Sequence, residues 1–279
     1  MKDITLVFPQ WQGSIDNEAL YEGALALADG INGLPSVQQV PTAPFREITP
    51  GGNIAGKDDI IKQLQEVNNI LEQKQPDRVL LLGGDCSTEI GPVSWMSRKH
   101  GDSLALVWFD AHPDLNTPAS SKSGRLQGMA LSAVLGNAGN EITETMFKPL
   151  LPKQVFCAGT RTFDPPELEF IVRNKMPFFG PGELERDPAW LATQITEAGF
   201  SKVYIHLDVD AVNPIGFNHG KPSPPAGLLF GNILKIIEEV GNKAQICGLG
   251  ITEFHPGSER GTEKAATLIE KSLPGFIKN

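Results

Sequence analysis

The sequence predicts a doubly wound α/β fold with a mainly parallel central sheet, and two observations support this fold class. Short runs that are almost wholly apolar recur along the chain, with longer segments of helical periodicity between them. Apolar runs of this length are typical of strands that are buried on both faces. No Gly-, Ser- or Pro-rich linker, change of composition or internal repeat divides the chain, so we expect one domain over residues 1–279.

The expected elements alternate in chain order. Strands are predicted at residues 4–8, 78–82, 104–109, 154–158, 202–207 and 244–251, because each of these runs is short, apolar and bounded by polar or turn-forming residues. Helices are predicted at residues 17–30, 57–74, 126–135, 166–175, 189–199, 231–240 and 262–273. Ligands of such sheets bind beyond the carboxyl ends of the strands, which directs attention to the residues that follow each strand.

Composition narrows the class of partner and the cellular compartment. The chain carries 33 acidic and 24 basic residues without a Lys/Arg-rich stripe, which argues against a nucleic-acid or anionic membrane surface. The apolar run at 4–8 stops at Pro9, too early for a signal sequence, and no later run approaches the length of a membrane span. The cysteines Cys86, Cys157 and Cys247 are odd in number and lack a C-x-x-C spacing, so we expect a reduced, cytoplasmic protein.

Two polar segments directly follow buried strands and carry the predicted chemistry. They are Asp110-Ala111-His112-Pro113-Asp114 and His206-Leu207-Asp208-Val209-Asp210. Residues at i, i+2 and i+4 of an extended chain lie on one face, so the polar side chains of each segment can converge on an ion at the edge of the sheet. Either segment alone could consist of turn and helix-capping residues. Their joint occurrence favours a metal site.

The types of ligand indicate the ion and the reaction. Carboxylate and imidazole groups favour hard or borderline divalent cations such as manganese. Carboxylates packed around one cavity repel one another, and a pair of ions that share bridging carboxylates would remove that repulsion and make a bound water reactive. Hydrolysis is therefore the expected class of reaction. The sequence leaves open whether the ring of His206 faces this site or the core.

The motifs together resemble those of the arginase, agmatinase and formimidoylglutamase family of ureohydrolases. The resemblance rests on Gly83-Gly84-Asp85-Cys86-Ser87 and the two segments above, in the order of that family's three metal-binding segments. It implies a three-layer α/β/α fold, a two-manganese centre and hydrolysis of a guanidino or formimino carbon–nitrogen bond. It also implies a small guanidino or formimino amino acid as the ligand, and a homo-oligomer, either a trimer or a hexamer.

The resemblance also implies roles for individual side chains. Asp110 and Asp208 would bridge the two ions, and His112 and Asp210 would complete one of the two sites. Asp114 would serve the other site and hydrogen-bond the nucleophile. Glu253, which ends the run Gly248-Leu249-Gly250-Ile251-Thr252-Glu253, resembles the carboxylate that orients the cationic head of the substrate.

Four further residues bear on the choice of substrate. Asn116 and Ser123 resemble the arginase loop that holds an α-carboxylate, and Asp164 and Glu167 resemble the pair that faces the α-amino group. Taken together they favour an α-amino acid over agmatine. Ordinary turn chemistry is the alternative for Asn116 and Ser123, and a helix N-cap with a capping box is the alternative for Asp164 and Glu167.

The chain departs from the family pattern at two positions of the expected site. Cys86 stands where the family has a metal-binding His, and a thiol is a poor partner for manganese. We therefore expect either a centre with one occupied ion site or zinc on the Cys86 side. Gln127 stands where arginases have a His that relays protons, and Gln cannot titrate. A substrate with a better leaving group, such as N-hydroxyarginine, would suit this site.

These observations predict a metal-dependent amidinohydrolase acting on arginine or an arginine-like amino acid such as N-hydroxyarginine, with release of urea or hydroxyurea. Hydrolysis of formimidoylglutamate or agmatine is the alternative within the same class. An alternative from another class is a catalytically silent relative that keeps the cavity as a binding module, as the losses of imidazole at Cys86 and Gln127 suggest.

Overall fold

One eight-stranded sheet forms the centre of the computed structural model, which describes residues 1–14, 18–43, 45–48, 53–215, 223–256 and 259–277. The strand order is β2-β1-β3-β8-β7-β4-β5-β6, and every neighbouring pair is parallel. The strands are β1 (Asp3–Phe8), β2 (Val37–Gln39), β3 (Arg78–Gly83), β4 (Leu104–Phe109), β5 (Val155–Ala158), β6 (Phe178–Phe179), β7 (Lys202–Asp208) and β8 (Gln245–Thr252). The predicted fold class is confirmed. The edge strands β2 and β6 were not predicted, because two or three residues are too few to show a periodic pattern.

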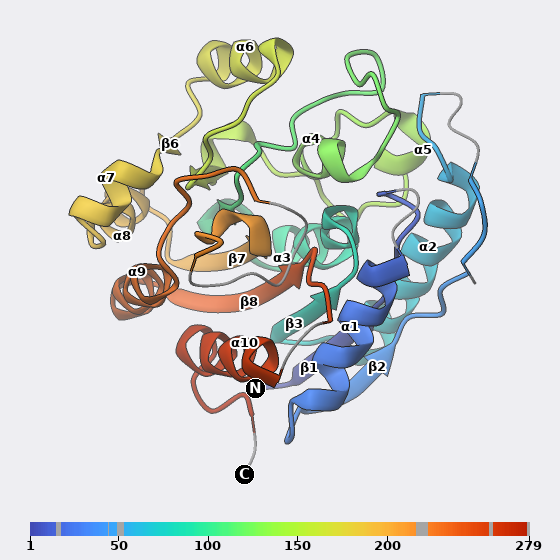
Figure 1. Ribbon diagram of the computed structural model, residues 1–279, viewed down its shortest axis with the longest axis horizontal. Helices are drawn as coiled ribbons and strands as arrows, with labels where there is room; N and C mark the ends of the chain where they lie inside the picture. The colour runs from blue at the N-terminus through green and yellow to red at the C-terminus, as the bar shows by residue number, and fades with distance from the viewer. Residues whose placement is uncertain (15–17, 44, 49–52, 216–222, 257–258, 278–279) are drawn as a thin grey trace.

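Helices lie on both faces of this sheet and make it the middle of three layers (Figure 1). They are α1 (Glu18–Gly30), α2 (Lys57–Lys74), α3 (Ile90–His100), α4 (Ala130–Val134), α5 (Asn140–Thr143), α6 (Pro165–Asn174), α7 (Pro181–Arg186), α8 (Trp190–Glu197), α9 (Phe230–Lys243) and α10 (Glu259–Ser272). Side chains of α1, α8, α9 and α10 pack in one apolar core, and side chains of α2, α3 and α4 pack in the other. The three-layer α/β/α arrangement is thereby established.

Four helical segments differ from the sequence prediction for physical reasons. Helices α5 and α7 were not predicted, because four and six residues are too few to show a helical period. Residues 126–135, predicted as one helix, form a 3₁₀ turn at Gln127–Met129 followed by the short α4. Helix α3 was not predicted, because all of its residues from Ile90 to Ser97 are buried. A helix that is covered on all sides has no exposed polar face, and it therefore lacks the amphipathic period by which a helix is recognised in a sequence.

The central strands are buried on both faces, as their apolar character predicts, whereas the edge strand β2 is partly exposed. Every residue of β3 and β4 is buried. Successive side chains enter opposite cores: Leu80 and Leu82 belong to one apolar cluster, and Val79 and Leu81 belong to the other. The central strands are therefore packed between two apolar cores, which hold their carboxyl ends in place.

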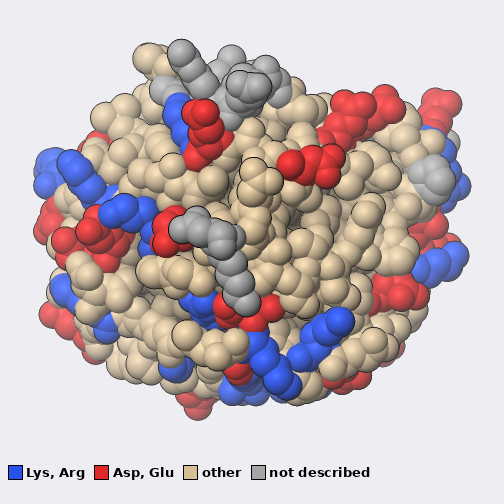
Figure 2. Space-filling view, turned by 90° about the horizontal axis from the view of Figure 1, so that it is seen from below, with Lys and Arg blue, Asp and Glu red and all other residues tan. Residues whose placement is uncertain are grey.

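Charged side chains of both signs are interspersed on the face shown in Figure 2, where no continuous basic stripe is visible. Oppositely charged neighbours on the surface include Arg98 with Glu72 and Lys271 with Glu238. Among the described residues, none of the helices combines the length and the apolar character that crossing a membrane requires.

Gly250 on β8 provides a test of the packing beneath the carboxyl edge of the sheet. A Cβ atom at Gly250 would lie 1.7 Å from Oε1 of the buried Glu89. We expect Gly250→Ala to lower the free energy of unfolding by about 1–3 kcal/mol, because a well-packed core does not accept an extra methyl group without strain. Urea denaturation measures this. Gly231→Ala on α9, where a Cβ meets nothing within 4 Å, is the control and should leave stability unchanged or slightly raised. Equal stability of both variants would contradict the prediction.

Candidate metal and substrate site

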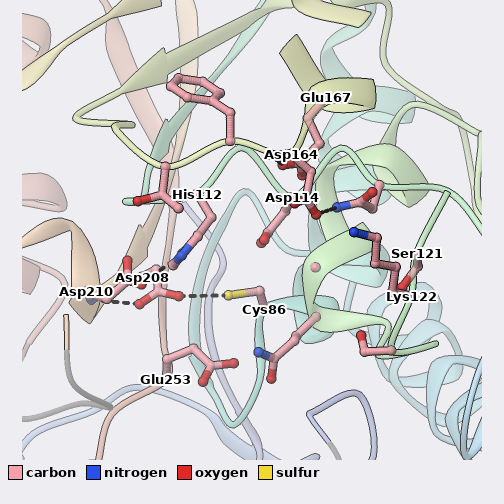
Figure 3. A pocket seen from close by; sticks show the side chains of 16 residues that line it. Cys86, His112, Asp114, Ser121, Lys122, Asp164, Glu167, Asp208, Asp210 and Glu253 are labelled. Carbon is pink, nitrogen blue, oxygen red and sulfur yellow. Dashed lines mark hydrogen bonds and ion pairs between the residues drawn. The ribbon is translucent and has the colours of Figure 1, made fainter. Parts of the chain in front are cut away.

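The polar segments singled out in the sequence meet at one edge of the sheet. Strands β3, β8, β7 and β4 are consecutive neighbours, and polar side chains follow the end of each. They surround a cavity of about 430 Å³ (Figure 3). The residues that line it are Cys86, His112, Asp114, Asn116, Ser121, Lys122, Ser123, Gln127, Gly128, Thr162, Phe163, Asp164, Glu167, Asp208, Asp210 and Glu253. Of the predicted site residues, only Asp110 lies behind this lining, where it is buried.

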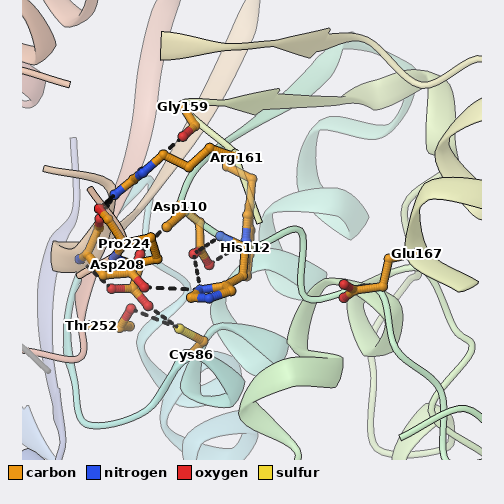
Figure 4. Close-up of polar contacts among 12 residues, drawn as sticks. Cys86, Asp110, His112, Gly159, Arg161, Glu167, Asp208, Pro224 and Thr252 are labelled. Carbon is orange, nitrogen blue, oxygen red and sulfur yellow. Dashed lines mark hydrogen bonds and ion pairs between the residues drawn. The ribbon is translucent and has the colours of Figure 1, made fainter. Parts of the chain in front are cut away.

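Asp110 accepts hydrogen bonds from strand β4 and from the turn that follows it. The amide of His112 donates to Asp110 Oδ1 at 2.7 Å, and Trp108 Nε1 donates to Asp110 Oδ2 at 3.1 Å. His112 Nδ1 lies 3.0 Å from Asp210 Oδ2 and 3.6 Å from Asp110 Oδ1. Ligand atoms of these three residues all lie within 4.8 Å of one another, so they could hold one cation (Figure 4).

Asp208 and Asp210 occupy the turn that follows β7. The Asp208 side chain accepts a hydrogen bond from the Asp210 amide at 2.7 Å and so caps the 3₁₀ turn Val209–Ala211. The guanidinium of Arg161 fastens the same turn by donating to the Asp210 carbonyl at 2.8 Å and to the carbonyls of Gly159, Pro224 and Pro225. The carboxylates are therefore placed by local backbone donors before any ligand is considered.

Cys86 lies at the base of the cavity, in the 3₁₀ turn Cys86–Glu89 that follows β3. Its thiol donates to Asp208 Oδ2 at 3.2 Å and lies 3.5 Å from Thr252 Oγ1. Burial, together with the charges of Asp208 and Asp114, raises the pKa of this thiol well above its ordinary value. The thiol therefore stays protonated at neutral pH unless a cation stabilises the thiolate.

The electrostatics of the site favour the binding of a positive charge. Burial and the neighbouring carboxylates raise the pKa of Asp208 and of Asp114 well above the ordinary range. Burial also acts on Asp110, but the two histidines beside it outweigh that effect and hold its pKa low. Burial would lower the pKa of His112, yet Asp110 and Asp210 raise it to about 12. Asp114 Oδ2 is buried without a hydrogen-bond partner among the described residues. This donor set suits a divalent cation.

The residues predicted for the substrate stand on the opposite wall. Asn116 Nδ2 donates to Asp164 Oδ2 at 2.9 Å. Glu167 accepts from the Asp164 amide at 2.8 Å and from the Leu115 amide at 3.0 Å, so it ties the start of α6 to the loop after β4. The Ser123 hydroxyl accepts from the Arg125 amide at 3.2 Å. The turn and capping contacts considered as alternatives are thus present, in side chains that also line the cavity.

Glu253 and Gln127 complete the predicted set. Glu253 follows β8 with a left-handed φ of 59°, and its amide donates to the Gly84 carbonyl at 2.7 Å. Asp114 has a left-handed φ of 51°. Such backbone conformations are uncommon outside glycine and are found at functional sites when the surroundings hold them in place. Gln127 begins a 3₁₀ turn, and its side chain lines the cavity.

Sequence reasoning missed two features of this site. Lys122 places its ammonium group toward the cavity (Figure 3), although a single exposed Lys beside Ser123 gives no pattern that sets it apart. Beneath the cavity, Glu89 lies 3.0 Å from the buried ring of His206, whose other nitrogen is directed toward Asp110. The polar spacing of His206 with Asp208 was the available signal for the second feature.

Known proteins share both sequence and fold with this chain. The profile described as "Arginase family" matches residues 35–273. The arginase of Entamoeba histolytica is 29% identical over 217 residues, which span 74% of this chain and 69% of that protein. Human arginase-1 is 30% identical over 221 residues, 75% of this chain and 68% of the relative. A crystal structure of the Entamoeba histolytica enzyme in complex with L-ornithine superposes with a TM-score of 0.86, at 21% identity and with 98% and 99% of the two chains covered.

Because the carboxylates repel one another, a substitution that removes one of their charges should stabilise the metal-free protein and weaken its binding of ions. We expect Asp208→Asn to raise the free energy of unfolding of the metal-free protein by about 0.5–2 kcal/mol, because it removes a buried negative charge from an acidic cluster. The same change should abolish the stabilisation that added manganese gives the unmodified chain. Thermal and urea denaturation with and without manganese measure both effects. Asp102→Asn at an exposed position is the control, and a similar response in both variants would refute the argument.

Proposed function

The chain belongs to the arginase family, and from that premise we propose that it is a metal-dependent amidinohydrolase of arginine or an arginine-like amino acid such as N-hydroxyarginine, with urea or hydroxyurea as one product. The observation that carries the proposal is the construction of the cavity. One wall gathers carboxylates and an imidazole suited to a cation, and the opposite wall carries side chains suited to the charged end of an amino acid.

The metal-binding residues in this proposal are Asp110, His112, Asp114, Asp208 and Asp210. The ions, manganese on the side of His112, would supply a water of lowered pKa and polarisation of the guanidino group. Asp114, whose Oδ2 has no hydrogen-bond partner in the described ranges, would accept a proton from the attacking water. Glu253 would hold the guanidinium by a charge-assisted contact. Oxygen from water bonds to the guanidino carbon, the bond to the leaving nitrogen breaks, and that nitrogen takes up a proton.

Gln127 influences which leaving groups are tolerated. It lines the cavity but cannot donate a titratable proton to a basic amine. When urea or hydroxyurea is released, the nitrogen that departs is the side-chain amine of the amino acid, and the hydroxylated nitrogen of N-hydroxyarginine stays in hydroxyurea. The departing amine must then take its proton from water or from another group, so Gln127 supports slow expulsion of a basic amine.

The opposite wall supports an α-amino acid rather than agmatine. Asp164 and Glu167 bring negative charge to the place proposed for the α-amino group, and Asn116 and Ser123 bring hydrogen-bonding groups for the α-carboxylate. Lys122 adds a positive charge at the same side of the cavity. Agmatine has no carboxylate to balance that charge. Formimidoylglutamate, which has carboxylates, remains the nearer rival within the same class of reaction.

A binding protein without turnover is the second candidate, and Cys86 favours it. The thiol is protonated where the family's pattern has an imidazole, so one ion site is weakened. The remaining carboxylates and His112 would still hold a cation and a ligand. Absence of turnover with every guanidino and formimino compound, together with retained ligand binding, would support this candidate.

A panel of substrates tests the main proposal. We expect the protein with added manganese to release urea or hydroxyurea from arginine or N-hydroxyarginine with a kcat/KM at least tenfold above that for agmatine. Asp208→Ala should abolish turnover, because it removes a carboxylate proposed to bridge the ions. Asp102→Ala at an exposed position should not affect it. Equal activity on agmatine and arginine would contradict the assignment to an α-amino acid.

Lys122 provides a separate test of substrate selection. We expect Lys122→Met to raise KM for the α-amino acid about tenfold or more with little change in kcat, because a charge-assisted hydrogen bond contributes about 1.5–3 kcal/mol. The KM and kcat for agmatine should not change. Steady-state kinetics on both substrates measure the split, and Lys62→Met on the exposed side of α2 is the control. A parallel loss with both substrates would show that Lys122 does not contact a carboxylate.

A further inference from the structure

A buried polar group lies directly beneath the cavity and is not used by the proposed reaction. His206 on β7 pairs in register with Trp108 on β4 and with Gly250 on β8. Its ring is fully buried and stacks on the indole of Trp108, with ring centroids 3.5 Å apart and planes inclined by 19°. A fully buried His in the middle of a parallel sheet costs free energy unless each ring nitrogen has a hydrogen-bond partner or binds a ligand.

One ring nitrogen is fixed by a carboxyl group. Glu89 Oε1 lies 3.0 Å from His206 Nδ1, and Glu89 Oε2 accepts a hydrogen bond from Tyr204 at 2.7 Å. Gly250 leaves the space that Glu89 fills, since a Cβ there would collide with Oε1. A carboxylate only accepts hydrogen bonds, so this contact places a ring proton on Nδ1. Burial would lower the pKa of the ring, but Asp110 and Glu89 raise it, so an ion that binds at Nε2 must displace the proton there.

The other ring nitrogen is directed at two potential ligands of a cation. His206 Nε2 is buried, has no hydrogen-bond partner among the described residues, and lies 3.9 Å from Asp110 Oδ2. Ligand atoms of Cys86, Asp110 and His206 all lie within 4.8 Å of one another. Zinc bonds of about 2.0–2.3 Å would separate tetrahedral ligands by roughly 3.5 Å. The ligand atoms would therefore need to approach one another by no more than about 1.3 Å, and those of His206 and Asp110 by only about 0.4 Å.

We propose that Cys86, Asp110 and His206 form a zinc-type ion site in which His206 supplies, from β7, the imidazole that position 86 lacks. The inference rests on the proposed function in one respect, because Asp110 is shared with the manganese side of the centre. Glu89 is then a positioning residue. It orients His206 as carboxyl groups orient metal-binding histidines in carboxylate–histidine–zinc arrangements.

The donor set explains why the ion would differ from the one at His112. A thiolate, an imidazole and a carboxylate are a combination that zinc accepts and manganese does not favour. The thiol now donates to Asp208, so ion binding must release the Cys86 proton to solvent as the metal–sulfur bond forms. Three protein ligands leave a fourth position, which is typical of zinc sites that bind water or substrate.

Cobalt and zinc titrations of the metal-free full-length chain test the ligand set without recourse to activity. The cobalt complex should show the thiolate charge-transfer band and the intense visible bands of a tetrahedral site. Cys86→Ala should remove the charge-transfer band, and Glu89→Gln should weaken zinc binding about 10- to 100-fold while keeping that band at saturation. His206→Ala should weaken zinc binding at least as much. Cys247→Ala is the control, because Cys247 is equally buried but donates to the Val203 carbonyl.

Specific outcomes would overturn the inference. A cobalt complex without a thiolate band, or zinc affinity that is unchanged in both Cys86→Ala and Glu89→Gln, would exclude this site. The Glu89→Gln result decides the question if His206→Ala fails to fold. If either of these negative results were found together with manganese-dependent turnover of arginine, the proposed zinc ligands would be refuted but the proposed function would be supported. Zinc binding as described, without turnover of any guanidino compound, would keep the ion site and refute the proposed function.

Discussion

Repulsion between buried carboxylates at the carboxyl edge of the sheet is the constraint on which the other features of this protein depend. Asp110, Asp114, Asp208, Asp210 and Glu253 face one small volume, and burial raises the cost of every charge among them. Backbone amides and the indole of Trp108 donate hydrogen bonds to some of these oxygens, yet one oxygen of Asp114 has no partner within the part of the chain that the structure describes. A bound cation would lower this electrostatic energy, because each carboxylate would be attracted to the ion.

The fold accommodates this concentration of charge because parallel strands end together. Strands β3, β8, β7 and β4 deliver their terminal residues to the same edge, and apolar cores on both faces keep the strands in register. The loops that follow need little length to bring ligands together. Strain is confined to a few positions, such as the left-handed backbone of Asp114 and Glu253, where the surrounding structure holds it.

The sequence predicted the parallel sheet and the convergence of its two polar segments, because both are local signals. Apolar runs identify strands, and the spacing i, i+2, i+4 identifies one face. Helix α3 was missed because burial on all sides erases its periodicity. The partnership of Glu89 with His206 was missed for a different reason. It joins residues 117 positions apart, and only the pairing of strands brings them together.

Cys86 and His206 are best understood as a pair. Taken alone, Cys86 is a lost imidazole that weakens an ion site, and His206 is an expensive buried side chain. In the proposed zinc-type site they would form, with Asp110, a three-ligand set of softer character. The proposed centre would then have two unlike halves that share Asp110: a hard half around His112 and Asp210, and a softer half around Cys86 and His206. Because Asp110 would belong to both halves, an ion in one half would alter the charge that the other experiences.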